Sequence, residues 1–249
     1  MMNRQIAKSS FGTSFGESFG TPRQLVAELV GTSFLLAAVV GSGIMAERLA
    51  QGNTALALLA NAIATGAALV ALILAFASVS GAHFNPVVTI TQAALSQISI
   101  RRAAGYIAAQ CTGALLGVFL AHVMFELPLL SVSQHARHGS GQLFGEFVAT
   151  LGLLLVIAGC QRAGVQATAF AVGAFITAGY WFTSSTSFAN PAVTLARSLT
   201  DTFAGIRPAD VPGFLLAQLL ACGMAVALIT WLMKAELEEV AENVAGAGS

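Results

Sequence analysis

The chain has 249 residues, of which 56% are hydrophobic and only 9% are charged, and its mean hydropathy is +0.80. A soluble domain carries about 25% charged residues, so this composition indicates an integral membrane protein. Eleven Lys and Arg residues balance eleven Asp and Glu residues, and this neutral charge predicts no nucleic-acid partner.

Residues 1–22 repeat Ser-Phe-Gly every four residues and lack the apolar core of a signal peptide, which predicts a flexible cytosolic tail. Six apolar runs follow that are long enough to span a bilayer as helices. They lie near 24–46, 55–79, 102–125, 142–160, 165–183 and 212–234. Residues 235–249 are rich in Glu and are predicted to form an acidic, solvated cytosolic tail.

Two shorter segments interrupt this series, at 80–97 and at 183–200, and each contains one Asn-Pro pair. The two halves resemble one another, since Glu28 and Glu146 each lie near the start of an apolar run. Three spans per half is an odd number, so the second half must enter the membrane from the opposite side. We therefore predict an all-helical channel domain over 23–234 built as an inverted repeat, with repeat one at about 23–125 and repeat two at about 142–234.

The Lys and Arg residues of the tails and loops predict the orientation, because cytoplasmic loops carry an excess of them. With both termini in the cytosol, seven lie inside and four outside. The inner residues are Arg4, Lys8, Arg23, Arg101, Arg102, Arg162 and Lys234, and the outer ones are Arg48, Arg137, Arg197 and Arg207.

The Asn-Pro pairs predict two short helices that begin inside the membrane. Irregular backbone is tolerated there only where it is buried in protein or lines water. Pro86 and Pro191 suit a first helical position, where the missing N–H would be unpaired anyway. Asn85 and Asn190 can cap these helices through the side-chain oxygen and leave the NH₂ group for a passing solute. Brought together, they would form a pair of donors in a narrow apolar pore.

The segment 80–90 (Ser-Gly-Ala-His-Phe-Asn-Pro-Val-Val-Thr-Ile), with Ala27-Glu28 and Asn190-Pro191-Ala192, resembles the aquaporin (major intrinsic protein) family. The resemblance covers about 23–234 and implies an aquaporin-like bundle of six transmembrane helices and two re-entrant half-helices. It further implies a homotetramer in the bacterial inner (plasma) membrane that conducts small neutral solutes passively, without cofactor.

The same resemblance implies roles for individual residues. The two pore motifs are Asn85-Pro86-Val87 and Asn190-Pro191-Ala192. Glu28 and Glu146 would bond the backbone of the re-entrant loops, and His83 would brace the first loop from the cytosolic side.

Four selectivity-filter positions carry over by their spacing from the asparagines: Thr65, Ala178 (Gly179 if the loop differs by one residue), Ser187 and Val193. The family nearly always has arginine where this chain has Val193. Small residues at the other positions predict a wide mouth without an aromatic wall. Arg197 lies one helical turn beyond Val193 and could replace the missing charge, bond loop carbonyls or extend outward.

A bacterial subgroup resembling this chain, with valine at the arginine position, is associated with arsenite. The resemblance therefore favours arsenous acid as permeant, with glycerol-like polyols and water, and a role in arsenic detoxification. A water-selective aquaporin, a secondary transporter with the same inverted repeat and a junctional membrane protein remain alternatives. An enzyme is disfavoured, because no nucleophile, base and orienting group converge in the membrane segments.

No metal site is predicted. Cys111, Cys160 and Cys222 lack CxxC spacing and are expected to pack between helices, although a thiol site for a soft metalloid stays open. His135 and His138 provide too few ligands for a stable metal site, so they indicate a solvated loop or a transient site at the outer vestibule.

Overall fold

The structure is a computed structural model that describes the backbone of residues 21–246 and the side chains of residues 22–232. The predicted tail at 1–22 lies almost entirely outside these residues, as do the side chains of the predicted acidic tail. The last long helix continues to residue 246, so the backbone of most of that acidic segment is helical.

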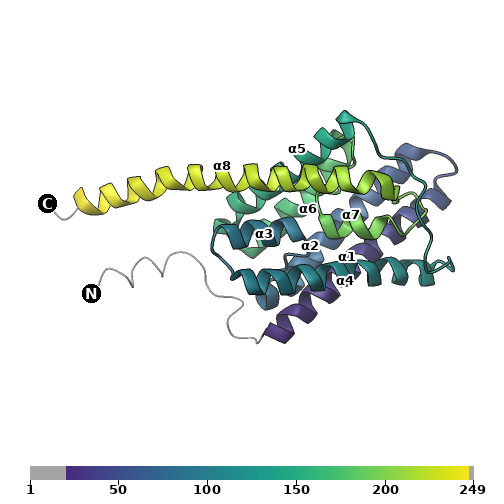
Figure 1. Ribbon diagram of the computed structural model, residues 1–249, viewed down its shortest axis with the longest axis horizontal. Helices are drawn as coiled ribbons and strands as arrows, with labels where there is room; N and C mark the ends of the chain where they lie inside the picture. The colour runs from purple at the N-terminus through teal and green to yellow at the C-terminus, as the bar shows by residue number, and fades with distance from the viewer. Residues whose placement is uncertain (1–20, 247–249) are drawn as a thin grey trace.

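Six long helices and two short ones form the described part of the chain (Figure 1). The long helices are α1 (Thr21–Leu49), α2 (Thr54–Ser80), α4 (Ile100–Met124), α5 (Ser140–Cys160), α6 (Val165–Phe182) and α8 (Val211–Gly246). The short helices are α3 (Pro86–Ala94) and α7 (Pro191–Arg197), and single 3-10 turns η2 (Gln161–Ala163) and η3 (Pro208–Asp210) precede α6 and α8. Each predicted apolar run falls within one long helix to within a residue, and all six are long and apolar enough to cross a membrane. The predicted fold class is confirmed.

The bundle is assembled from two similar sets of four helices. In the first set α1 packs against α2 and α4, and in the second α5 packs against α6 and α8. The short helices join the sets, because α3 contacts α8 of the second set and α7 contacts α4 of the first. Figure 1 shows α3 and α7 end to end along the middle of the bundle.

Glycines permit the closest helix contacts within this assembly. A Cβ atom at Gly113 of α4 would collide with the backbone carbonyl of Leu29 on α1, and one at Gly117 would collide with that of Ser33. Backbone atoms cannot move aside as flexible side chains can, so α1 and α4 lie together only because these positions lack a side chain. By contrast, nothing lies within 4 Å of a Cβ at Gly223 of α8, so this glycine makes no close helix contact.

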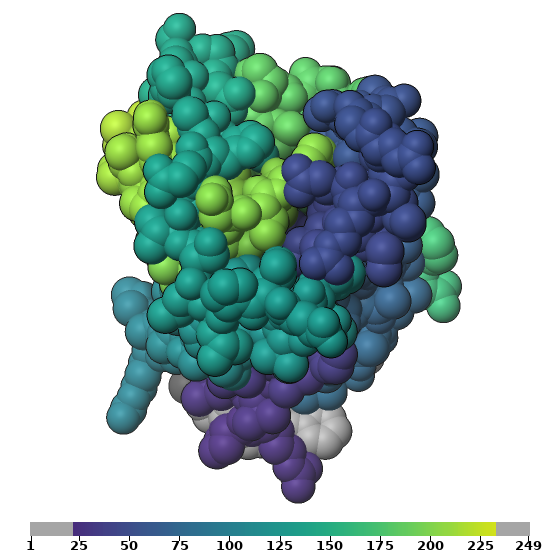
Figure 2. All heavy atoms as spheres, turned by 90° about the vertical axis from the view of Figure 1, so that its right-hand side faces the viewer, coloured from purple at the N-terminus to yellow at the C-terminus, as the bar shows by residue number. Residues whose placement is uncertain are grey.

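We call the end of the bundle where α1 ends and α2 begins the outer end, following the predicted orientation, and the opposite end the inner end. The connection between the repeats, residues 125–139, crosses the outer end. It is bonded to the α7–α8 connection, where Ser131 N donates to Leu199 O at 3.1 Å and Arg207 N donates to His135 O at 2.8 Å. Figure 2 shows the α7–α8 connection (yellow-green) at the centre of this face, between the 125–139 region (teal) and the α1–α2 turn (blue).

Candidate pore

Both asparagines cap the short helices that follow them. Asn85 Oδ1 accepts a hydrogen bond from Val87 N at 3.0 Å, and Asn190 Oδ1 accepts one from Ala192 N at 3.0 Å. Each is followed by proline at the first helical position. Each cap therefore satisfies backbone N–H groups that would otherwise be unpaired in the middle of the bundle.

Each asparagine amide also bonds the loop of the other repeat. Asn85 Nδ2 donates to Ala189 O at 2.7 Å, and Asn190 Nδ2 donates to Phe84 O at 2.8 Å. A carboxamide NH₂ group carries two hydrogens, so each asparagine keeps one for another acceptor. The sequence predicted two free amides, whereas the structure shows each amide shared between the opposite loop and the cavity described below.

The residue before each asparagine has an unusual backbone conformation. Phe84 and Ala189 have φ values of 50° and 47°, in the left-handed region that non-glycine residues rarely occupy. Such a conformation costs roughly 1–3 kcal/mol and persists only where the surroundings enforce it. It turns the carbonyls of these residues toward the opposite asparagine. No residue type in the sequence signalled this geometry.

Two buried carboxylates hold these strained loops. Glu28 accepts backbone hydrogen bonds from His83 N at 2.9 Å and from Phe84 N at 2.7 Å. Glu146 accepts them from Phe188 N at 2.8 Å and from Ala189 N at 2.9 Å. Neither carboxylate is exposed.

A glutamine from the last helix of each repeat completes the arrangement. Gln110 Nε2 donates to Glu28 Oε2 at 2.8 Å and to Thr89 Oγ1 at 2.9 Å. Gln218 Nε2 donates to Glu146 Oε2 at 2.7 Å and to a threonine hydroxyl on α7 at 2.9 Å. Sequence reasoning missed both glutamines, although each is an isolated amide inside an apolar span and so carried a detectable signal.

His83 lies on the inner side of the first loop. Its Nδ1 is 3.0 Å from Thr89 Oγ1, and its ring meets that of Tyr106 edge to face, with 5.2 Å between centroids. The imidazole therefore links the loop to α3 and α4, next to the cavity that it lines.

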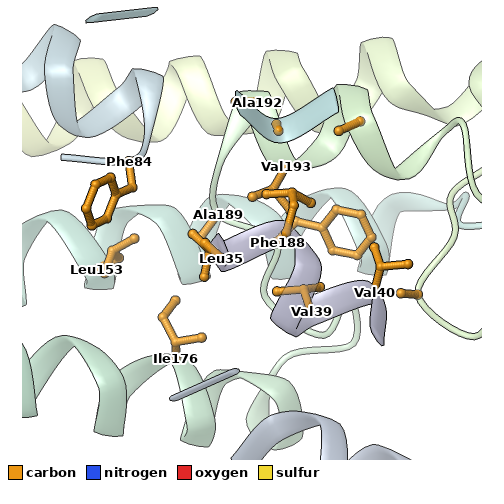
Figure 3. Packing of buried hydrophobic residues seen from close by; sticks show 14 of the residues in the cluster. Leu35, Val39, Val40, Phe84, Leu153, Ile176, Phe188, Ala189, Ala192 and Val193 are labelled. Atoms are coloured by element: carbon orange, nitrogen blue, oxygen red, sulfur yellow. The ribbon is translucent and has the colours of Figure 1, made fainter. Parts of the chain in front are cut away.

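A cavity of about 420 Å³ passes beside both asparagines. Its inner end is lined by polar side chains, which include Gln24, Gln97, Arg102, Tyr106 and Gln161. Its middle is largely apolar, with Leu35, Leu69, Ile73, Val88, Leu153, Val172 and Ile176 among its lining residues. Figure 3 shows Leu35, Leu153 and Ile176 beside Ala189, where the two repeats meet. The apolar middle of the cavity offers a solute few hydrogen-bonding groups, and the asparagine amides are among them.

Three of the four predicted filter residues line the outer end of this cavity: Thr65, Ser187 and Val193. The fourth, Ala178, does not. It is exposed on α6, and its neighbour Gly179 is packed against the Ser187 side chain. The prediction of Ala178 from its distance to Asn190 was wrong, because that distance does not determine which face of α6 points into the cavity.

Residues of α6 reach the cavity at intervals of four: Thr168, Val172, Ile176 and Tyr180. This helical spacing was the signal that could have identified Tyr180. Its hydroxyl lies 3.2 Å from Thr65 Oγ1, and the side chain is 3% exposed. The expectation of a mouth without an aromatic residue is therefore wrong, because Tyr180 forms part of the wall and Thr65 orients it.

Arg197 combines two of the roles considered from sequence. Its Nε donates to the carbonyl of Ala204, and the side chain also lines the cavity. It does not extend outward, since it is 2% exposed. Its guanidinium carbon lies 3.4 Å from the centroid of the Phe188 ring. A second arginine, Arg137, reaches the same ring from the 125–139 connection, at 4.9 Å.

The cysteines and outer histidines lie away from this cavity. Cys222 is buried with its Sγ 3.3 Å from Thr91 Oγ1, while Cys111 and Cys160 are partly buried. None of the three is among the residues that line the cavity. His135 and His138 are exposed, and no cluster of three metal-ligating side chains occurs within the described residues.

Comparison with known proteins agrees with this geometry. The chain matches the major intrinsic protein family over residues 17–163 and belongs to that family. It is 51% identical over 218 residues to aquaglyceroporin AqpS of Rhizobium meliloti (strain 1021), which covers 88% of this chain and 93% of that protein. It is 30% identical over 184 residues to the probable aquaporin NIP4-2 of Arabidopsis thaliana, a match that covers 71% of this chain and 64% of that protein.

The fold also matches a solved structure. The aquaglyceroporin from Plasmodium falciparum superposes with a TM-score of 0.65 at 21% identity, covering 85% of this chain and 95% of that chain. At this identity the likeness concerns the fold alone. The family predicted from the two Asn-Pro motifs is confirmed.

Proposed function

We propose that the protein is a passive channel for small neutral solutes, namely glycerol-like polyols and arsenous acid together with water. The observation that carries this proposal is the cavity of about 420 Å³ that passes both asparagine amides and has Val193 at its outer end. The relative from Rhizobium, an aquaglyceroporin by name, supports the polyol part.

The character of the lining favours neutral, hydroxyl-bearing permeants. Its apolar middle cannot solvate a bare ion, while the free hydrogens of Asn85 and Asn190 can donate to a hydroxyl oxygen. The helices that begin at these residues also direct their positive dipole ends inward, which opposes cations. Arsenous acid is neutral at pH 7 and carries hydroxyls as a polyol does. On this reading the channel serves arsenic detoxification by letting arsenous acid follow its gradient.

A secondary transporter is less well supported. Alternating access requires one repeat to rock against the other. Here the reciprocal bonds of Asn85 and Asn190 join the two repeats at their centre, and each short helix packs on a long helix of the other repeat. Saturable, ion-dependent flux in vesicles would favour the transporter. A lack of flux for every solute would favour a junctional role.

The experiment is stopped-flow light scattering on proteoliposomes, with water, glycerol and arsenous acid compared in wild type and Val193→Arg. The added guanidinium narrows the outer end, so we expect glycerol and arsenous acid flux to fall more than water flux, on the order of tenfold or more. Val193→Leu is the matched control, because it adds bulk without charge or donors. Equal loss of all three fluxes in the arginine variant would remove Val193 from the selectivity argument and favour a general block.

We further propose a homotetramer in the bacterial inner membrane, with residues 23–234 as the channel domain and both termini in the cytosol. The beginning of α1 and the end of α8 lie at the same end of the bundle, which supports a common side for the termini (Figure 1). Native mass spectrometry tests the oligomer. Protease added to sealed inside-out vesicles tests the orientation of the termini. The cytosolic face points outward in these vesicles, so a cytosolic C-terminus would be cleaved without opening them.

A further inference from the structure

We propose that the outer end of the cavity, around Arg197, is a binding site for small monovalent oxyanions. This site goes beyond conduction of neutral solutes, because an oxyanion held there would obstruct their passage. The proposal rests on the arginine geometry at the outer end and on the partners of the nearby carboxylates.

Arg197 presents unused donors to the cavity. It is 2% exposed yet lines the cavity, and the structure records one hydrogen bond from its side chain, from Nε to the carbonyl of Ala204. The planar guanidinium carries five N–H groups, so the Nη groups remain available to a ligand. Phe188 supports the guanidinium from one side at 3.4 Å and restricts its orientation.

Arg137 adds a second positive charge beside the same ring. It is 7% exposed, and its Nε donates to Gly205 O at 2.8 Å. Burial lowers the pKa of Arg137 to about 10, so this side chain still carries its charge at neutral pH. Two cations thus lie near Phe188, one supplied by α7 and one by the 125–139 connection.

The nearby carboxylates are engaged with other groups. Glu146 accepts from the backbone of the second loop, Asp210 accepts from Arg137 N at 2.8 Å and from Arg207 Nη2 at 2.9 Å, and Asp201 accepts from a backbone N–H. Within the described residues, neither Arg197 nor Arg137 forms an ion pair. A buried charge without a carboxylate in direct contact is costly, and a bound anion would offset that cost.

The donor geometry selects the class of ligand. An oxyanion such as nitrate offers two acceptor oxygens to the planar fork of Arg197, whereas a cation would be repelled.

The experiment measures glycerol flux in proteoliposomes at equal ionic strength and osmolarity in sodium nitrate and in sodium gluconate, whose anion is too large for the site. We expect nitrate to slow wild-type flux in a saturable way. In Arg197→Met, with inhibition measured against that variant's own flux in gluconate, the half-inhibiting nitrate concentration should rise at least about tenfold, as expected for the loss of one hydrogen bond to a charged group.

Arg48→Gln is the matched control. Arg48 also lies over a phenylalanine, Phe125, and bonds its carbonyl at 3.1 Å, but it is exposed at the outer end and does not line the cavity. This variant should keep both the flux and its inhibition by nitrate. Arg197→Lys serves as a second variant if Arg197→Met does not fold. It keeps the positive charge but removes the planar fork, so it should weaken inhibition severalfold.

Absence of nitrate inhibition in wild type, or equal inhibition in wild type and both site variants, would overturn the proposed site. Neither result would affect the channel proposal, which stands or falls on wild-type glycerol flux in gluconate alone.

Discussion

The two repeats hold their asparagine loops in the same way but differ at the mouths of the cavity. Glu28 and Glu146 bind the loops through corresponding hydrogen bonds, and the partner glutamines do the same in each repeat. Two residues before the asparagine, repeat one has His83 and repeat two has Phe188. Seven residues after it, repeat one has Gln92 and repeat two has Arg197.

This difference separates the residues that support the loops from those that determine which solutes enter the cavity. Strained backbone needs the same support in both repeats, so the carboxylates and glutamines recur. The mouths face different solutions, and there the side chains diverge: an imidazole and an amide occupy these two positions in repeat one, whereas repeat two has an aromatic ring with Arg197 packed on it. The predictions below test this division, beginning with the largest expected effect.

The shared carboxylates should be the most sensitive positions. Replacing Glu28 or Glu146 by alanine leaves at least two backbone N–H groups, and one of the two hydrogens of a glutamine amide, without an acceptor in a buried loop. At about 1–3 kcal/mol for each unsatisfied group, we expect a loss of about 4 kcal/mol or more. Thermal unfolding of the detergent-solubilised variants measures it. If only one of the two alanine variants lost stability, Glu28 and Glu146 would not be structurally equivalent.

The helix contacts differ between the repeats, because Gly113 of α4 lies against another helix and Gly223 of α8 does not. Gly113→Ala places a methyl group against the Leu29 backbone, and such overpacking costs about 1–3 kcal/mol. Gly223→Ala is its matched control, because nothing lies within 4 Å of the added methyl group, and it should lose no stability and gain up to about 1 kcal/mol of helix propensity. Thermal unfolding of the detergent-solubilised variants measures both changes in stability. If both variants lost equal stability, the close α1–α4 contact would not be the cause.

The asparagines should contribute equally. Asn85→Ala and Asn190→Ala each remove one cap and one bond to the opposite loop, and together these are worth about 2 kcal/mol. Because both side chains serve a single junction, the double variant should lose less than the sum of the two singles. Strict additivity of the unfolding free energies would argue that the two bonds act independently.

The outer wall should show the smallest effect on stability. Thr65→Val removes the hydroxyl that lies 3.2 Å from Tyr180 and should cost about 1 kcal/mol. Freeing the Tyr180 ring should change glycerol flux more than water flux in stopped-flow measurements, because only the larger solute fills the outer end. Tyr180→Phe is the control, since it removes the same bond from the other partner. Opposite effects of the two variants on flux would show that the bond does not orient the wall.

Most of the fold could be predicted from the sequence, because the bilayer requires long apolar helices and the Asn-Pro pairs have few other uses there. The positions of the two glutamates followed from comparing the repeats. Ala178 was misplaced because distance along the chain does not determine which face of α6 points inward, whereas the four-residue interval ending at Tyr180 does. Arg137 could not have been predicted, since its approach to Phe188 depends on how a connection without regular structure crosses the outer end.

The reciprocal asparagine bonds have a consequence for biogenesis. The acceptor of the Asn85 amide, Ala189 O, lies 104 residues further along the chain. When the first three spans have left the ribosome, that acceptor does not yet exist, so the first re-entrant loop cannot form this bond until the second half has been made. Insertion of the second half therefore completes the first, and a nascent chain arrested before residue 189 would expose a half-built core to quality-control proteases.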